Sequence, residues 1–168
     1  MHNDQLKELL IDQVRDIYDA EKQLVKALPK LAKASQSEEL GDAIRQHWDD
    51  TQRQVERLET IFEFLEVPAK GKTCKGMKGL IAEGSEAAEE AEGVLRDLAI
   101  IAASQRVEHY EISAYGTART IAERFGNKQI AALLQETEDE ERAADGKLTE
   151  IATALYDSQA REMEMASA

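Results

Sequence analysis

The sequence predicts an all-α protein, a bundle of four long helices with one long crossover between the second and the third. Three features of the 168-residue chain indicate this fold. Apolar side chains recur at three- and four-residue steps over four long stretches, which is the spacing of one helix face. Only two prolines occur in the chain. Short polar turns separate the first stretch from the second and the third from the fourth. We therefore expect one helical domain over residues 1–168.

The first two helices are predicted over residues 6–34 and 38–66. Pro29 lies inside the first helix and should bend its last turns, because it removes one backbone hydrogen bond. Pro68 should stop the second helix. The inward face of the second helix is expected to comprise Leu40, Ile44, His47, Thr51, Gln54, Leu58, Ile61 and Leu65.

The crossover is rich in glycine and lysine and covers residues 67–93. A short apolar piece within it predicts an extra helix over residues 77–90, laid across the bundle. The third long helix is predicted from 94 to 125, because Gly126 and Asn127 form a good helix stop. The fourth is predicted from 128 to 156, and the polar tail after it is expected to be frayed.

A shift of 90 residues relates the two halves of the chain. It pairs apolar positions of the second helix with those of the fourth: Leu40 with Ile130, Ile44 with Leu134, Leu58 with Leu148, Ile61 with Ile151 and Leu65 with Leu155. The same shift relates the first helix to the third. One offset for both helix pairs indicates an internal repeat.

Charge and composition exclude several classes of partner. The chain has 34 acidic and 21 basic residues, a formal net charge of −13, so it should repel nucleic acids and anionic membrane surfaces. No apolar run approaches the roughly 20 residues of a membrane helix, and the sequence shows no secretory signal, so we expect a cytoplasmic protein. The single cysteine, Cys74, excludes an intrachain disulfide and a cysteine-based zinc site.

Carboxylates stand on the predicted inward faces of the helices. Under the shift of 90 residues, Glu21 pairs with Glu111 and Asp50 pairs with Glu140. Burying carboxylates together is costly unless cations, shared protons or basic side chains compensate them. Such a set of hard oxygen ligands suits manganese, magnesium, calcium or ferric iron over zinc or copper. Bundle cores with carboxylates on each helix hold iron or manganese, so we expect one or two ions of these metals. The candidate ligands are Glu21, Asp50, Gln54, Glu108, Glu111, Glu140 and Glu141.

A polar layer without metal is the alternative for these carboxylates. Protons with raised pKa values, or ion pairs with Arg53 or Arg119, would then compensate the charge. His47 is interpreted as a hydrogen-bonded core histidine in preference to a ligand. Cys74 is interpreted as an exposed loop thiol without a role.

The strings DAEKQL, VEHYE followed by YGT, and EERAADGKL resemble the YciF-type stress-response proteins of the ferritin-like superfamily. The similarity runs from about residue 6 to 156. It implies a ferritin-like four-helix bundle, a homodimer and a metal role in bacterial stress physiology. Trp48, Phe62, Phe64 and Tyr110 are expected near helix edges, where they could form the dimer contact.

The Glu-x-x-His motif of well-characterised dimetal bundles is incomplete in this chain. Arg53 stands three residues after Asp50, and Ala143 stands three residues after Glu140. Three functions therefore remain open: a metal-binding stress protein, a metal-free structural or interaction protein that has lost the histidine ligands, and a slow peroxide- or oxygen-consuming enzyme. No catalytic residue is assigned.

Overall fold

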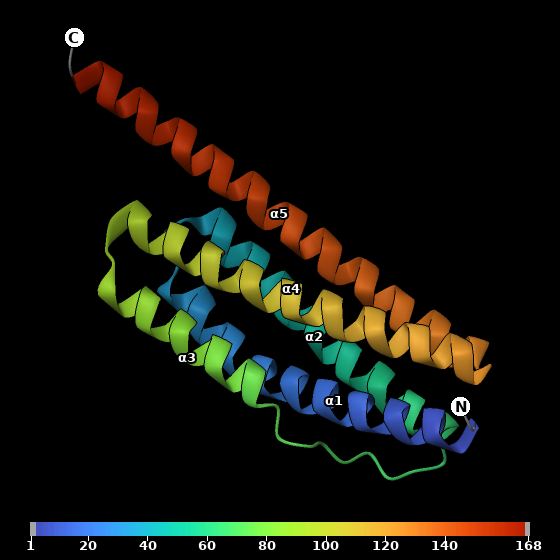
Figure 1. Ribbon diagram of the computed structural model, residues 1–168. Helices are drawn as coiled ribbons and strands as arrows, with labels where there is room; N and C mark the ends of the chain where they lie inside the picture. The colour runs from blue at the N-terminus through green and yellow to red at the C-terminus, as the bar shows by residue number, and fades with distance from the viewer. Residues whose placement is uncertain (1–2, 167–168) are drawn as a thin grey trace.

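A computed structural model describes residues 3–166, which form five helices and no strand. The helices are α1 (Asn3–Ala34), α2 (Glu38–Phe64), α3 (Lys75–Glu90), α4 (Gly93–Phe125) and α5 (Lys128–Ala166). The four long helices pack as a bundle in which α1 lies beside α2 and α4 beside α5, while the short α3 lies against α1 and α4 (Figure 1). The predicted all-α bundle and its crossover helix are confirmed.

Local sequence sets the helix ends. The Ser37 hydroxyl accepts a hydrogen bond from a first-turn amide of α2 at 3.4 Å, and the Asn127 side chain accepts one from the Ile130 amide at 3.0 Å at the start of α5. Gly126 has a φ of 90°, and its N–H donates to the carbonyl of Ala122. Glycine suits this left-handed position because it has no Cβ. The tight turn therefore directs α5 back along α4.

Two helix ends differ from the predicted ones. α2 ends at Phe64, shortly before the predicted 66, because Glu66 adopts a left-handed backbone with a φ of 58°. α5 continues beyond 156 to Ala166, so the tail expected to fray is helical as far as residue 166, and residues 167 and 168 lie outside the described range. No described side chain after Ile151 is buried, and this end of α5 projects past the other helices (Figure 1). Within residues 3–166, no helix is apolar enough over a sufficient length to cross a membrane.

The bundle core consists of two apolar clusters with polar side chains between them. The first cluster includes Leu10 and Ile17 of α1 with Leu58 of α2. The second includes Leu24 and Leu28 of α1 and Ile100 in the first half of α4. We call the buried polar side chains between them the polar layer: Glu21, His47, Thr51, Gln54, Glu108, Glu111, Thr137 and Glu141.

Cys74 fastens the crossover to the bundle. It precedes α3 as the N-cap and is fully buried, so its expected exposure is wrong. Its Sγ lies 2.9 Å from the hydroxyl of Tyr110, which donates a hydrogen bond to Asp16 at 2.7 Å. The Lys72 amide also donates to the Arg15 carbonyl at 3.0 Å. These bonds hold the crossover along α1, which covers the thiol.

Candidate metal centre

Four helices contribute side chains to one place in the polar layer. α1 supplies Glu21, α2 supplies His47, α4 supplies Glu108 and Glu111, and α5 supplies Glu141. Each of the five has an exposed fraction of 9% or less. Glu108 and Glu111 share a helix face because residues three apart lie one above the other. We call these five residues the carboxylate cluster.

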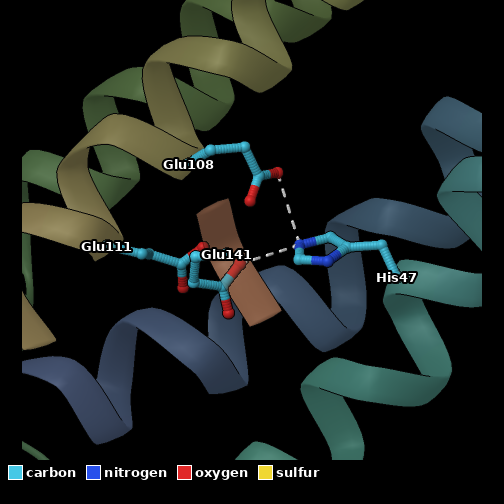
Figure 2. A group of neighbouring side chains, drawn as sticks. All are labelled: His47, Glu108, Glu111 and Glu141. Carbon is cyan, nitrogen blue, oxygen red and sulfur yellow. Dashed lines mark ion pairs between the residues drawn. The ribbon is translucent and has the colours of Figure 1, made fainter. Parts of the chain in front are cut away.

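His47 faces the carboxylates from the opposite side of the bundle. Its Nε2 lies 3.4 Å from Oε1 of Glu108 and 3.8 Å from Oε2 of Glu141 (Figure 2). Potential ligand atoms of His47, Glu108, Glu111 and Glu141 all lie within 4.8 Å of one another. Ligands on opposite sides of a small divalent ion are roughly 4–5 Å apart. The spacing therefore fits one ion at this position.

Most of the polar atoms in the carboxylate cluster lack a hydrogen-bond partner. Both oxygens of Glu111 and both of Glu141 are buried and unpartnered, as are Oε2 of Glu21, Oε2 of Glu108 and Nε2 of His47. A buried acceptor without a partner costs about 1–3 kcal/mol, and more when it is charged. Atoms of this kind, converging on one point, suit a cation.

Burial raises the pKa values of Glu21, Glu108 and Glu111 well above their ordinary range. Repulsion adds to burial, because Glu141 lies near each of them and Glu21 lies near Glu111. Of these three, only Glu21 gains opposing contributions to its pKa: the hydroxyl of Tyr115 donates a hydrogen bond to its Oε1, and the neighbouring carboxyl of Glu111 also lowers it. In the metal-free protein, these carboxyls hold protons to a higher pH than free glutamate does.

Three of the sequence-predicted ligands lie outside the carboxylate cluster. Glu140 accepts hydrogen bonds from Gln54 and from Arg57, each at 2.9 Å. Although partial burial works against it, these bonds hold the pKa of Glu140 below its usual range. Asp50 is partly exposed and pairs with Arg53. The structure thus brings together Glu21, Glu108, Glu111 and Glu141, but not Asp50, Gln54 or Glu140.

On both α2 and α5, the buried polar position lies one residue after the predicted one. Thr51 and Glu141 are fully buried where Asp50 and Glu140 were expected. Neighbouring helix positions are about 100° apart, so this shift moves a side chain from the core to its edge. The sequence did contain a signal: Thr51 lies on the predicted inward face, and the shift of 90 residues pairs it with Glu141.

His47 belongs to the carboxylate cluster, although the sequence was interpreted as giving it a hydrogen-bonded core role in preference to that of a ligand. Its Nε2 faces two carboxylates and forms no hydrogen bond. The predicted arginine partners lie elsewhere: Arg53 pairs with Asp50, and Arg119 pairs with Glu123 and Glu138. The carboxylate cluster is therefore not held by either of these ion pairs.

Residues 5–161 match the protein family described as domain of unknown function DUF892. The chain belongs to this family. It is 44% identical over 149 residues to Protein YciF of Escherichia coli strain K12, covering 88% of this chain and 90% of the relative.

Solved structures agree with this assignment. The crystal structure of the E. coli stress protein YciF has 43% identity and a TM-score of 0.87, covering 90% of this chain and 97% of that one. A putative structural protein from Rhodopseudomonas palustris, YcfI, has 41% identity and a TM-score of 0.83, covering 86% and 92%. A Xanthomonas campestris protein at 22% identity shares the fold, with a TM-score of 0.73 over 95% of this chain and 99% of that one.

Proposed function

We propose that this chain is a ferritin-like metal-binding protein that holds one or two iron or manganese ions in the carboxylate cluster. The observation that carries the proposal is the set of buried, unpartnered carboxylate oxygens facing His47. Four carboxylates and one imidazole form a mostly hard ligand set, which favours iron and manganese over copper. The cluster contains no cysteine, so soft-metal chemistry has no support.

The charge of the cluster bears on how many ions it holds. Glu21, Glu108, Glu111 and Glu141 carry −4 when all are ionised, so two divalent ions would neutralise them and one would neutralise half. The close ligand spacing around His47 supports one position. Glu21 lies next to Glu111 and Glu141 and has a free Oε2. We propose that Glu21 and these neighbours form the second position.

The physiological setting is inferred from the relatives. The E. coli structure is described as that of a stress protein, and the chain matches 90% of the length of Protein YciF. We propose that this chain also serves in a bacterial stress response, in the cytoplasm. Its metal site would then store or buffer an ion, or perform slow redox chemistry.

Metal analysis of the whole chain, combined with thermal melting, tests the proposal. Protein purified without chelator should contain iron or manganese, and adding Mn²⁺ to chelator-treated protein should raise its melting temperature by binding only the folded state. Glu111→Gln should abolish or strongly reduce this increase. Glu140→Gln is the matched control and should keep it, because Glu140 bonds to Arg57 outside the cluster. An unchanged melting temperature of the wild type with both iron and manganese would contradict the proposal.

A metal-free structural protein is the second candidate. Two observations favour it: the raised pKa values, which let protons compensate the cluster, and the description of the R. palustris relative as a putative structural protein. This function predicts that Mn²⁺ leaves the melting temperature unchanged. It also predicts that Glu111→Gln stabilises the fold equally with Mn²⁺ and with chelator.

A further inference from the structure

We propose that the groove between α2 and α5 is the path by which a divalent cation enters and leaves the carboxylate cluster, with His47 as the first ligand it meets. This inference rests on the proposed metal-binding function. It adds a route, a gate residue and a kinetic behaviour to the site.

The cluster needs such a path because its carboxylates are closed off from solvent. The side chain of Glu141 has an exposed fraction of 0% and that of Glu108 has 3%, whereas that of His47 has 10%. Along the bundle axis, the two apolar clusters close the polar layer on both sides. An ion must therefore pass between helices.

The α2–α5 groove provides this passage. It has a volume of about 790 Å³ and lies between the first half of α2 and the middle of α5. Its walls include Ile44 and Leu148, and its inner end is lined by His47, Glu108 and Ser104. A hollow on the α3 side also reaches Glu108, but its volume of about 20 Å³ admits little more than one water. Of these two hollows beside Glu108, the larger groove has room for an ion with part of its hydration shell.

The charges along the groove suit a cation that passes without being retained. Its lining contains Glu38, Glu39, Asp42, Asp50 and Glu140, with Lys147 as the basic residue among them. Four of the five acids are ion-paired: Asp42 with Arg45, Asp50 with Arg53, Glu140 with Arg57 and Glu39 with Lys147. Transport through a pore requires sites that attract an ion yet bind it weakly. Acids already paired at the entrance meet this requirement.

The inner end of the groove differs, because its polar atoms have no partners. Oγ of Ser104, Nε2 of His47 and Oε2 of Glu108 are buried and form no hydrogen bond. His47 lies within 4 Å of both Glu108 and Glu141, with Nε2 distances of 3.4 and 3.8 Å. His47 and Glu108 line the groove, whereas Glu111 and Glu141 do not. An ion arriving along the groove therefore reaches the side chains of His47 and Glu108 before the deeper Glu141 and Glu111. The Ser104 hydroxyl is placed to bond a water that travels with the ion.

The kinetics of Mn²⁺ exchange test the path. Ala144 is half-buried in the groove wall, and Ala144→Phe should obstruct it. Because an equilibrium constant does not depend on the route, obstruction should slow association and release equally, at least tenfold, and leave the Kd unchanged. Association is measured from the loss of the Mn²⁺ paramagnetic resonance signal on mixing, and release from its transfer to excess chelator. Ala34→Phe is the matched control, since Ala34 is also half-buried but lines a separate groove against α3.

The outcomes separate the path from the site. Slowed exchange with an unchanged Kd in Ala144→Phe, and wild-type exchange in Ala34→Phe, would support the path. If Ala144→Phe does not fold by circular dichroism, Ala43→Phe on the α2 wall takes its place. Wild-type rates in a folded obstructed variant would overturn the path, as would a Kd weakened as much as the rate, or equal slowing in the control. If the wild type binds no Mn²⁺ at equilibrium, the proposed function fails and the path fails with it.

Discussion

Glu111 shows how a single buried carboxyl makes protons and cations compete in this protein. Its side chain is 1% exposed, neither oxygen has a hydrogen-bond partner, and Glu21, Glu108 and Glu141 surround it. An ionised Glu111 therefore needs a nearby positive charge, while a protonated one does not. Since metal ligands must be deprotonated, a cation that binds here releases protons, so metal affinity should rise with pH.

The stability of the metal-free protein should fall as pH rises above about 4.5. The folded state holds the pKa values of Glu21, Glu108 and Glu111 above the ordinary value of 4.5, so it binds more protons than the unfolded chain above that pH. The stability from these groups is present at low pH and lost as pH rises through their folded pKa values. Melting in chelator at pH 5, 6, 7 and 8 measures this. A melting temperature that is constant or rises over this range would be the opposite result.

Glu111→Gln and Glu140→Gln should change stability in opposite directions in the metal-free protein at pH 8. The first removes a repelled charge and adds an amide donor, and should raise the melting temperature by roughly 2–4 °C per kcal/mol gained. The second removes the carboxylate paired with Arg57 at 2.9 Å and should destabilise by about 1 kcal/mol. Denaturant titrations give both values. If both substitutions changed the stability in the same direction, the contacts of Glu111 and Glu140 would not explain the opposite pKa shifts of the two residues.

The sequence pointed to some members of the carboxylate cluster and not to others. Glu21 and Glu111 were found because isolated charges interrupt clear apolar stripes. Glu140 and Glu141 are adjacent residues of the same type. Which of them is buried depends on how α5 is rotated about its axis, and tertiary packing sets that rotation. His47 was on the predicted inward face, but its partners come from α4 and α5, and no local pattern records that contact.

At the scale of elements, the repeat relates α2 to α5, and two positions of the site differ between them: His47 pairs with Thr137, and Thr51 pairs with Glu141. The shift of 90 residues pairs the fully buried Thr51 with the fully buried Glu141, so α2 carries a hydroxyl where α5 carries a carboxylate. The Thr51 hydroxyl bonds to the carbonyl of His47 at 2.9 Å in its own helix. The cluster is consequently asymmetric, with its buried carboxylates on α1, α4 and α5.

Thr51→Glu should give α2 the buried carboxylate that α5 carries at Glu141. The added carboxylate would raise repulsion within the cluster, so the metal-free variant should melt at a lower temperature than the wild type. With Mn²⁺ it should bind two ions and gain a larger increase in melting temperature, because it offers a further ligand. Isothermal titration gives the stoichiometry. Asp50→Glu is the control. A similar change in stoichiometry and melting temperature in this variant would show that residue 50, and not residue 51, faces the cluster.

α3 is fixed by close packing of its first turn on α4. A Cβ added at Gly76 would lie 2.9 Å from Cε2 of Tyr110, whereas one added at Gly79 would meet nothing within 4 Å. Gly76→Ala should therefore force Tyr110 to move, disturb its hydrogen bonds with Cys74 and Asp16, and destabilise by about 1–3 kcal/mol. Gly79→Ala should stabilise by roughly 0.5–1 kcal/mol, since alanine favours a helix interior. Chemical denaturation compares them, and a loss of stability in both variants would contradict this account.

At the scale of the whole molecule, the aromatic residues expected to form a dimer contact are mostly used inside the bundle. Phe62 is buried, Trp48 donates a hydrogen bond to the Val25 carbonyl at 2.9 Å, and Tyr110 contacts Cys74. Phe64 stays exposed at 43%. The projecting end of α5 carries apolar side chains that are more exposed, because Tyr156 is 61% exposed and Met163 is 73% exposed.

We expect this chain to form a homodimer through the projecting end of α5. Tyr156 and Met163 are seven residues apart, so they share one helix face. No described side chain of α5 after Ile151 is buried, and a short helical end that buries no side chain is marginal in water. A second copy in an isologous contact would cover both faces at once. Light scattering should give about twice the chain mass of 18.7 kDa. Replacing Tyr156 and Met163 together by lysine should yield a folded monomer at micromolar concentration.

Leu95→Lys, which changes an equally exposed apolar residue at the start of α4, should leave the dimer intact. A monomeric wild type would reject the dimer, and a dimer that survives the double substitution would place its contact elsewhere.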